Sequence, residues 1–207
     1  ITSADESISL KFPVVLKAQV LSGKRADVGG ILFAENEEEY KNQIEKLLGT
    51  TINKEKVDQV LVEEKADIEK EYYVSISYDT ETRGPILTIS ESGGTGIEER
   101  GAENFSINPL NPVENLPDII EKQLLEKLVN LFFAQDCLLL EVNPLIKTRS
   151  GEWMALDAKV KLDDFAKPRH KEDWDFSPRS APGHNPTKGE IEAKKIIEGI
   201  KSVYYSS

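Results

Sequence analysis

Short runs of apolar residues, bounded by glycine, proline and charged residues, predict β-strands in the first half of the chain. Residues 13–20, 31–34 and 59–64 are three such runs, and the first is apolar enough to be a buried strand. Residues 71–79 and 84–90 carry β-branched and aromatic side chains on either side of a polar turn, which predicts a β-hairpin. The first 90 residues are therefore expected to be rich in strands.

Two stretches have apolar residues at helical spacing and predict amphipathic helices. Residues 36–49 place acidic residues in the first turn and Gly49 at the C-terminal end. Residues 117–135 carry an apolar stripe formed by Ile119, Ile120, Leu124, Leu128 and Leu131. A glycine-rich loop at 91–101 and a proline-rich linker at 108–117 precede this second helix. The mixture of strands and helices indicates an α+β or α/β fold.

A second hairpin is predicted between residues 137–146 and 152–160, because Gly151 can adopt the positive φ that a short hairpin loop requires. If the hairpin is centred on Ser150, the numbers of cross-strand partners sum to 300, and Asn143 lies opposite Asp157. One face is then apolar and expected in the core, with Val142, Pro144, Ile146, Met154, Leu156 and Ala158. The other face carries Glu141, Asn143, Asp157 and Lys159.

The polar face of this hairpin has the chemistry of a magnesium site. Directly opposed residues have Cβ atoms roughly 5 Å apart, so the carboxamide of Asn143 and the carboxylate of Asp157 are expected to converge. Mg²⁺ prefers oxygen ligands and usually takes one or two from the protein, beside water and phosphate. A solvated outer face with surface ion pairs would show the same residues, and the pattern alone leaves both interpretations open.

The first strand and the loop after it suggest a second element of a binding site. Lys17 lies on the face opposite the most apolar residues of its strand, and burying a lysine is costly without an anionic partner. The loop that follows contains Lys24 and Arg25 between glycines, so its amides and cations are suited to a polyphosphate. It lacks the Walker A pattern, and an exposed basic turn is the alternative.

The composition is that of a globular protein, with 39% hydrophobic and 30% charged residues in a chain of 207. The net charge of −11 argues against a nucleic-acid-binding surface but is compatible with a local nucleotide pocket. Cys137 is the single cysteine and is expected to be buried, in a protein of a reducing compartment. No apolar run approaches the ~20 residues that cross a bilayer.

Four segments of the sequence resemble one family. FPVVLKAQVLSGKRADVGGI, LVEEKADIEKEYYV, ESGGTGIEE and LLLEVNPLIKTRSGEWMALDAKV are similar, in order and spacing, to the ATP-grasp part of the succinyl-CoA synthetase β subunit. The related subunits of ATP-citrate lyase and citryl-CoA synthetase look similar too. The resemblance covers roughly residues 10–165, and the combination of EVNPL with ALDAK is its most specific part. It implies an α+β ATP-grasp fold, with two lobes of mixed and antiparallel sheets flanked by helices.

The resemblance also implies a domain organisation. Residues 1–166 are expected to form the nucleotide-binding domain, with a small lobe at about residues 12–62 and the remainder in a larger lobe. Residues 167–207 are expected to be a polar, proline-rich tail or lid that ends in a short helix. The C-terminal domain that completes the CoA ligases of this family is expected to be absent from the chain.

Four residues are implied at the nucleotide phosphates. By position, Lys17 contacts the phosphates, and Lys24, Arg25 and Ala26 form the loop that covers them. The family loop is usually GGRGKAGG, whereas this chain has GKRADVGG, in which Lys24 and Ala26 replace two glycines and Asp27 is added. The substituted loop has less freedom for its backbone to approach phosphate closely.

Five further residues are implied at the base, the ribose and the metal. Glu63 and Ala66 would lie along the adenine hinge, and Glu71 would bind the ribose. Asn143 and Asp157 would bind Mg²⁺, which agrees with the hairpin geometry. The resemblance therefore implies Mg²⁺ and ATP or GTP as cofactors, and it assigns no catalytic residue to this chain.

The family reaction joins a carboxylic acid to CoA with ATP or GTP, through a phosphohistidine. His170 and His184 lie in the polar tail and are expected to be surface residues, so the phosphohistidine is expected on a CoA-binding partner subunit or domain. This predicts a hetero-oligomeric ligase of the cytoplasm, or of the mitochondrial matrix in a eukaryote. The chain is expected to be inactive alone and to bind neither nucleic acid nor membrane.

An alternative function is a non-catalytic module, an ATP-grasp relic that binds a nucleotide or a partner. The altered loop and the absent C-terminal domain favour the relic, whereas the intact set of Lys17, Glu71, Asn143 and Asp157 favours the ligase subunit. The sequence leaves open whether the acid is succinate, citrate or malate, and whether the nucleotide is ATP or GTP.

Overall fold

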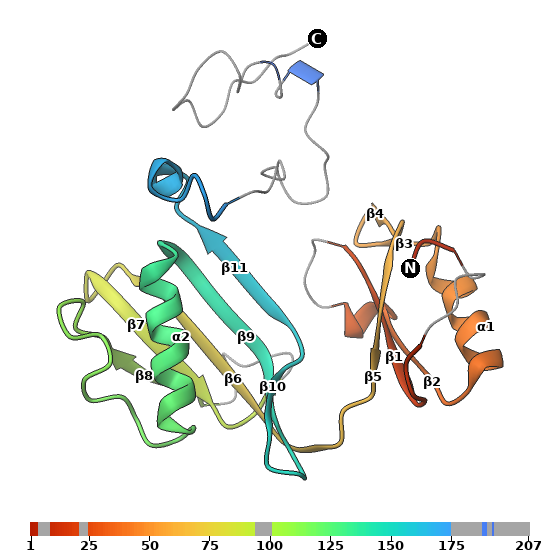
Figure 1. Cartoon of the computed structure of the whole chain (residues 1–207), viewed down its shortest axis with the longest axis horizontal. Helices are drawn as coiled ribbons and strands as arrows, with labels where there is room; N and C mark the ends of the chain where they lie inside the picture. The colour runs from red at the N-terminus through yellow and green to blue at the C-terminus, as the bar shows by residue number, and fades with distance from the viewer. Residues whose placement is uncertain (4–8, 21–24, 94–100, 175–187, 190–191, 193–207) are drawn as a thin grey trace. The chain divides into compact units, whose positions relative to one another are not determined.

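The computed structural model describes residues 1–3, 9–20, 25–93, 101–174, 188–189 and 192 of the chain. It divides into two compact units, and the boundary between them falls between Ala66 and Asp67. Unit 1 comprises residues 1–66 and the few described residues after 175, and the described part of unit 2 ends at Trp174. Figure 1 shows both units with their labelled elements. Each unit has its own sheet and its own hydrophobic core.

Unit 1 is built on a three-stranded antiparallel sheet in the order β2-β1-β5 (Figure 1). Its strands match the three predicted runs and are β1 (Val14–Ala18), β2 (Ile31–Ala34) and β5 (Val60–Glu64). A 3₁₀ turn at Ala26–Val28 and a small ladder of β3 (Thr51–Ile52) and β4 (Glu55–Lys56) complete the strands and turns. The core lies on one side of the sheet, where Val14, Leu16 and Ala18 are buried.

Helix α1 (Glu37–Leu47) covers that side of the unit 1 sheet and contributes Tyr40, Ile44 and Leu47 to the core. Asn36 caps its N-terminus, because the side-chain oxygen accepts a hydrogen bond of 3.0 Å from the backbone N–H of Glu39. Glutamates fill the first turn, where the helix dipole favours negative charge. The chain then turns away at Gly49, whose φ is +78°. The predicted start and end of this helix are confirmed.

Unit 2 is an antiparallel sheet in the order β10-β9-β6-β7-β8, with β11 also paired to β9 (Figure 1). The strands are β6 (Ile68–Asp79), β7 (Gly84–Ser90), β8 (Glu103–Ser106), β9 (Cys137–Thr148), β10 (Trp153–Ala155) and β11 (Ala158–Leu162). Both predicted hairpins are therefore present, one between β6 and β7 and one between β9 and the pair β10 and β11. The segment at 108–117 forms no helix or strand, as its prolines predict.

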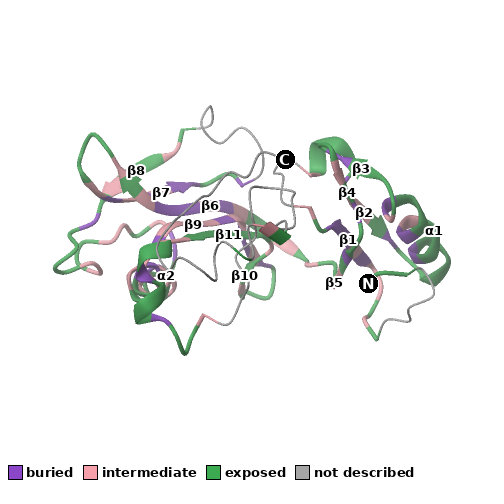
Figure 2. Cartoon of the chain, turned by 90° about the horizontal axis from the view of Figure 1, so that it is seen from above, coloured by how far each residue is buried: buried purple, intermediate pink, exposed green. Residues whose placement is uncertain are grey.

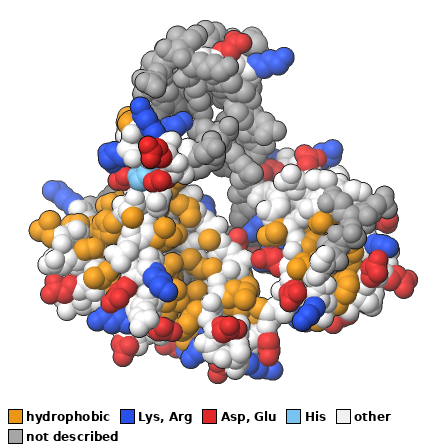
Figure 3. All heavy atoms as spheres, in the orientation of Figure 1, with side chains coloured by type: hydrophobic (Ala, Val, Ile, Leu, Met, Phe, Trp, Pro, Cys, Tyr) orange, Lys and Arg blue, Asp and Glu red, His pale blue; other side chains and the backbone are white. Residues whose placement is uncertain are grey.

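Helix α2 (Lys122–Ala134) packs on one face of this sheet. Figure 2 shows the buried stretches of β6 and β7, and the core that they share with α2 includes Val74, Ile76, Leu87 and Phe132. Figure 3 shows that apolar side chains gather on the side of unit 2 that carries α2, with charged side chains around its rim. No helix among the described residues is long and apolar enough to cross a membrane.

The sequence prediction for α2 was wrong in its start and at Leu131, whereas Ile119, Leu124 and Leu128 of the predicted stripe do pack against the core. The helix begins at Lys122, and Ile120 is buried in the turn before it. The buried stripe is Leu125, Val129 and Phe132, while Leu131 is 46% exposed. Apolar doublets along the helix offer two stripes about 100° apart, and the sequence alone does not say which one meets the sheet.

The outer strand of the second hairpin is more exposed than predicted. Met154 is 45% exposed and Ala158 is exposed, although both were expected in the core. Strands β10 and β11 pair only with β9, so they form an edge of the sheet. An edge strand keeps the alternation of its side chains, but α2 packs over the inner strands and leaves the edge less covered.

The segment from Asp163 to Trp174 is packed against unit 2, where the sequence predicted an extended polar tail from Lys167 onward. A 3₁₀ helix covers Asp164–Arg169, and Asp163 caps it through a 3.0 Å bond to the N–H of Phe165. The backbone N–H of Asp163 also donates to the carbonyl of Asp136, at the junction of α2 and β9. The segment is therefore tied to the sheet at its beginning.

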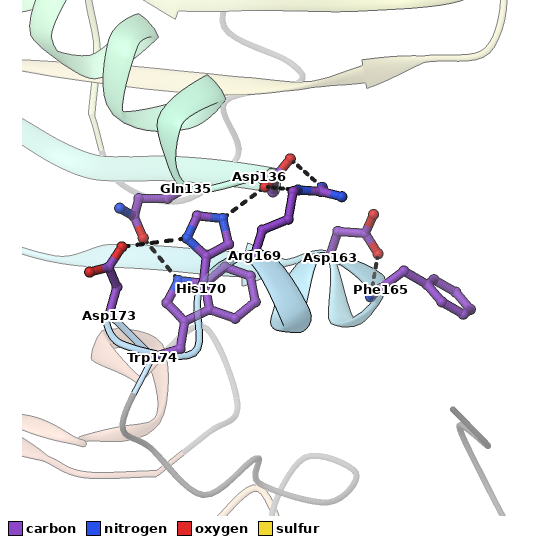
Figure 4. Close-up of polar contacts among 8 residues, drawn as sticks. All are labelled: Gln135, Asp136, Asp163, Phe165, Arg169, His170, Asp173 and Trp174. Carbon is purple, nitrogen blue, oxygen red and sulfur yellow. Dashed lines mark hydrogen bonds and ion pairs between the residues drawn. The ribbon is translucent and has the colours of Figure 1, made fainter. Parts of the chain in front are cut away.

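His170 is buried, which contradicts the prediction that it is a surface residue. Its Nε2 lies 2.7 Å from Oδ2 of Asp136, and the same carboxylate accepts bonds of 3.2 and 2.8 Å from Nε and Nη2 of Arg169 (Figure 4). The His170 ring stacks on Trp174, whose Nε1–H donates to Oε1 of Gln135. Asp136, which also binds Arg169, and the stacked ring of Trp174 therefore bury His170, although the segment around it is polar in sequence.

Four expectations lie outside the described residues. They concern Lys24, most of the glycine-rich loop at residues 94–100, His184, and the C-terminal helical pattern at the end of the tail.

Candidate magnesium–nucleotide site

The hairpin of β9 with β10 and β11 has the predicted register. Met154 pairs with Ile146, and Lys159 pairs with Glu141, so partner numbers sum to 300 on both sides of the Asn143–Asp157 pair. The backbone N–H of Asn143 donates to the carbonyl of Asp157 over 3.0 Å. Gly151 supplies the turn with a φ of +87°. Asn143 and Asp157 are therefore direct cross-strand neighbours, which brings a carboxamide and a carboxylate to the same place on the sheet.

Strand β9 carries a bulge at this same point. Val142 pairs with Val74 of β6, and Leu145 pairs with Tyr72, so Asn143 and Pro144 together oppose one residue of β6. The bulge breaks the alternation of side chains, so Leu145 joins Val142 in the core although the two are three residues apart. The Asn143–Pro144 peptide is cis. Asn143 is half-buried and Asp157 is exposed, so the pair lies at the surface of unit 2, where a ligand can reach it.

Glu71 and Gly93 lie beside the bulge. Glu71 belongs to β6 and pairs with Ile146 of β9. Gly93 is buried, and a Cβ atom built on it would lie 2.8 Å from Cβ of Pro144 and 3.1 Å from Cβ of Glu71. The structure therefore brings the predicted ribose ligand to the residue that adjoins Asn143. Sequence reasoning missed Gly93, although the glycine pair directly after a strand was a usable signal.

A row of polar side chains crosses the sheet of unit 2 next to the Asn143–Asp157 pair. Along this row the strand register runs through Lys159, Glu141, Ser75, Thr88 and Asn104. The hydroxyl of Thr88 donates to Oδ1 of Asn104 over 2.7 Å. Neighbouring residues on these strands point to the apolar core, because side chains alternate between the two faces. The Asn143–Asp157 pair thus adjoins a polar face of the sheet.

The donor set fits a magnesium ion. Asn143 and Asp157 offer one amide oxygen and one carboxylate, which is the small, hard, oxygen-only set that Mg²⁺ uses when phosphate and water complete its shell. Within the described residues, no group of three or more histidine, cysteine or acidic side chains could hold a metal ion. The described residues therefore offer no site for a metal that needs three or more such protein ligands. Mg²⁺ bound to a polyphosphate needs fewer, and the pair of Asn143 and Asp157 can supply them.

Unit 1 contributes Lys17, which is only 8% exposed and lies on the face of the sheet that α1 does not cover. Its ammonium forms an ion pair with the carboxylate of Glu63. The register places Lys17 opposite Leu61 and Val15 opposite Glu63, so the two charged residues are diagonal neighbours on one face. Phe33 and Leu61 are exposed on the same face. An apolar surface with one buried cation is suited to a ring that carries an anionic group.

The loop after β1 is described from Arg25 onward. The Arg25 Nη1–H donates to the carbonyl of Ala18 over 3.2 Å, so this guanidinium is partly held by its own sheet. Ala26 is exposed at the start of the 3₁₀ turn. Gly29 has a φ of +75°, and Gly30 donates its N–H to the carbonyl of Arg25 over 2.7 Å. A Cβ at Gly30 would lie 2.9 Å from that carbonyl, so this second glycine is required by space.

The hinge residues named from the sequence lie in two places. Glu63 is inside β5 and is paired with Lys17, whereas Ala66 lies in the irregular segment between β5 and β6, at the end of unit 1. Glu71 belongs to unit 2. Within unit 1 the structure thus brings Lys17 and Glu63 together, and within unit 2 it brings Glu71 to the bulge at Asn143 and Pro144.

Comparison with known families identifies the fold. The model of a family described as an ATP-grasp domain matches residues 2–118. This chain belongs to the ATP-grasp family. Among curated proteins, the β subunit of ADP-forming succinate–CoA ligase from Methanocaldococcus jannaschii is 39% identical over 189 residues, covering 79% of this chain and 50% of that protein. The corresponding subunit from Bacteroides thetaiotaomicron is 38% identical over 177 residues, covering 76% of this chain and 47% of its own length.

Solved structures agree on the ATP-grasp fold. ATP citrate lyase from Methanothrix soehngenii, in complex with citrate and coenzyme A, superposes with a TM-score of 0.71 at 24% identity. That match covers 89% of this chain and 47% of the lyase chain. A dinucleotide-forming acetyl-coenzyme A synthetase from Ca. Korarchaeum cryptofilum superposes with a TM-score of 0.55 at 22% identity, over 73% of this chain and 77% of its own. The ATP-grasp fold predicted from the sequence is confirmed.

The chain spans about half the length of the curated relatives that it matches. Those relatives are ligase subunits, and the family binds nucleotide and Mg²⁺ in general. What the whole of such a relative does is carried to this chain only as a proposal.

Proposed function

We propose that this chain is the Mg–nucleotide-binding part of an ADP-forming acid–CoA ligase, of the succinyl-CoA or citryl-CoA type. In this proposal the chain binds ATP or GTP and delivers a phosphoryl group to a histidine on a CoA-binding partner subunit or domain. The observation that carries the proposal is the cross-strand pair of Asn143 and Asp157, with Glu71 beside it. The family membership and the ligase relatives support it.

The roles of the residues follow from their chemistry. The oxygens of Asn143 and Asp157 would hold Mg²⁺, which when bound neutralises phosphate charge as a Lewis acid. Lys17 would place an ammonium against the phosphates, and its ion pair with Glu63 holds that ammonium in place. Glu71 would accept hydrogen bonds from ribose hydroxyls. Catalysis of phosphoryl transfer is mainly positioning and electrostatic stabilisation, so these groups suffice for this chain's share.

The environment of His170 argues against this histidine as the phosphoryl acceptor. Nε2 of His170 is engaged by Asp136, and Nδ1 faces the carboxylate of Asp173 at 3.7 Å. A phosphoryl group added to either nitrogen would meet a carboxylate at close range, and like charges repel strongly in a buried site. His170 is therefore a poor phosphate acceptor and a good structural residue.

A second candidate function is a nucleotide-binding or partner-binding module without catalysis. The contact between Arg25 and the carbonyl of Ala18 favours it, because this guanidinium is engaged by its own sheet. The replacement of two loop glycines by Lys24 and Ala26 favours it as well. The two functions differ in whether phosphate is transferred, so they are separated by experiment.

Nucleotide binding is tested by calorimetry with Mg–ATP and Mg–GTP. The parent chain is expected to bind one of them in the micromolar to millimolar range, and Asp157→Ala is expected to weaken binding roughly 10- to 100-fold, since it removes the charged metal ligand. The matched control is Asp164→Ala, an exposed aspartate of the 3₁₀ helix that should leave binding unchanged. Absence of binding at millimolar nucleotide, or parent-like binding by Asp157→Ala, refutes the proposed site.

Phosphate transfer separates the ligase subunit from the inert module. With γ-labelled ATP and Mg²⁺, the chain alone is expected to stay unlabelled, and an added CoA-binding subunit is expected to gain an acid-labile label of the kind that phosphohistidine gives. His170→Gln should leave that transfer in place. Label on this chain that His170→Gln abolishes would place the acceptor here and contradict the proposal, whereas nucleotide binding without any transfer supports the second function.

A further inference from the structure

Gly93 has no room for a side chain. A Cβ atom on it would lie 2.8 Å from Cβ of Pro144, 3.1 Å from Cβ of Glu71 and 3.3 Å from Oε2 of Glu71. Separations under 3.0 Å require something to move, and Cβ of Pro144 belongs to a rigid ring. Glu71 is likewise fixed at its Cβ, because β6 pairs with β9 at Ile146. Neither neighbour can yield by rotating a flexible side chain.

Space is the reason for a glycine at this position, because its backbone conformation does not demand one. The glycines with positive φ are Gly29, Gly49, Gly101 and Gly151, and Gly93 is not among them. An L-residue could therefore adopt the Gly93 backbone without strain. The same substitution is unfavourable only because Pro144 and Glu71 occupy the volume that a methyl group would need.

The segment that brings Gly93 to this place is held by its own contacts. Lys70 of β6 forms a 2.7 Å ion pair with Glu91, and the hydroxyl of Ser90 accepts a 3.3 Å bond from the N–H of Ser92. The Lys70–Glu91 pair ties the chain after β7 to β6, and the Ser90–Ser92 bond is a local contact within that segment. Gly93 is thus pressed between a strand that carries Glu71 and the residue that follows Asn143.

We propose that Gly93 is a positioning residue of the magnesium–nucleotide site, whose bare backbone sets the places of Glu71 and, through Pro144, of Asn143. This inference rests on the proposed function, because Glu71 and Asn143 are nucleotide and metal ligands only within it. A methyl group at Gly93 displaces Pro144 or Glu71, and the oxygen of Asn143 then moves relative to its cross-strand partner Asp157. Small misplacements of this kind are expensive at metal and phosphate sites.

The test compares Gly93→Ala with Gly84→Ala. Gly84 begins β7, has no positive φ, and would place a Cβ no closer than 3.9 Å to the carbonyl of Thr82, so it is a matched control. Gly93→Ala is expected to raise the dissociation constant for Mg–ATP roughly 10- to 100-fold, and Gly84→Ala to leave it unchanged. Electron paramagnetic resonance of Mn²⁺ with ATP should show a matching loss of bound metal in Gly93→Ala.

A purely structural role for Gly93 gives a different result. Gly93→Ala would then melt at a lower temperature, while the folded variant, checked by circular dichroism, binds Mn²⁺ and Mg–ATP as the parent does. That outcome overturns the inference and leaves the proposed function intact if Asp157→Ala still weakens binding. Failure of the parent chain to bind any nucleotide overturns the proposed function itself, and the inference with it.

A measurement on the parent chain keeps the inference testable if Gly93→Ala does not fold. Substoichiometric Mn²⁺ with ATP is expected to broaden the amide NMR signal of Gly93 and to spare that of Gly84. The two ends of β7 lie roughly 20 Å apart, at about 3.3 Å a residue between Gly84 and Ser90. If Mn²⁺ and ATP bind and the Gly93 signal stays sharp, the glycine is remote from the metal and the inference is wrong.

Discussion

One carboxylate, that of Asp136, holds the start of β9 and the C-terminal segment of unit 2 together. It accepts two bonds from Arg169 and lies 2.7 Å from Nε2 of His170 (Figure 4). The guanidinium of Arg169, and after it the His170 ring, hold the pKa of this carboxyl below its usual range. Asp163 lies near Arg169 and Asp173 faces His170, so both partners of Asp136 have a second acidic neighbour. The residue therefore acts through its charge as well as through its geometry.

The lowered pKa of Asp136 makes part of the stability of unit 2 dependent on pH. Because the pKa is lower in the folded than in the unfolded state, the stabilisation is fully present above the unfolded pKa of about 4 and is lost as the pH falls through the folded value. Asp136→Asn is expected to reduce the free energy of unfolding by about 1–2 kcal/mol at pH 7. This value allows for the screening of the exposed Arg169 by solvent. Urea unfolding of the parent and of Asp136→Asn, from pH 7 down to pH 3, measures this difference in free energy.

The control for this prediction is Asp173→Asn, whose carboxylate is exposed and 3.7 Å from the ring of His170. It should change stability by less than about 0.5 kcal/mol. The difference between the parent and Asp136→Asn should shrink between pH 5 and pH 3. A difference that stays constant over this range would show that the carboxylate acts through shape and hydrogen bonding alone.

At the scale of the element, neighbouring residues of α2 differ sharply in burial. Phe132 is fully buried, with its ring centroid 5.5 Å from Tyr78 and 5.4 Å from Phe133. Leu131, one residue earlier, faces outward. The two positions differ by about 100° around the helix axis, and only one of them meets the sheet.

Substitutions at these two positions are expected to differ in cost. Phe132→Ala should lower the free energy of unfolding by about 3–5 kcal/mol, because it empties a packed aromatic site. Leu131→Ala should cost less than about 1 kcal/mol, since its side chain is already in contact with solvent. Equal costs measured by chemical denaturation would mean that Phe132 and Leu131 are buried to the same extent, which contradicts this arrangement of the helix.

The same two elements show what a sequence pattern can and cannot predict. Strand pairing between Glu141 and Lys159 follows from a turn glycine and a count of residues, because an antiparallel ladder has a strict period of two. The buried face of α2 does not follow, since its apolar doublets satisfy two helical stripes equally. The burial of His170 was also out of reach, because its partner Asp136 lies far away in the sequence and its own neighbours are charged.

At the scale of the whole molecule, the candidate residues are shared between two units that fold around separate cores. Lys17 and Glu63 belong to unit 1, whereas Glu71, Asn143 and Asp157 belong to unit 2. Family resemblance could assign all five, because it carries position along the chain. Gly93 was assigned by neither pattern nor resemblance, since its significance depends on atoms of two other strands that meet it in space.

The hairpin that carries Asn143 and Asp157 also limits how this protein can vary in length. Both residues stand seven positions from Ser150, one on each strand. One residue inserted into a single arm would rotate one of the two side chains to the opposite face of the sheet, whereas one residue added to each arm would lengthen the tip and leave the pair opposed. Tolerated insertions between these two residues should therefore be symmetric about the turn, so that aligned hairpins of this kind differ in length by an even number of residues, a restriction that ordinary surface loops lack.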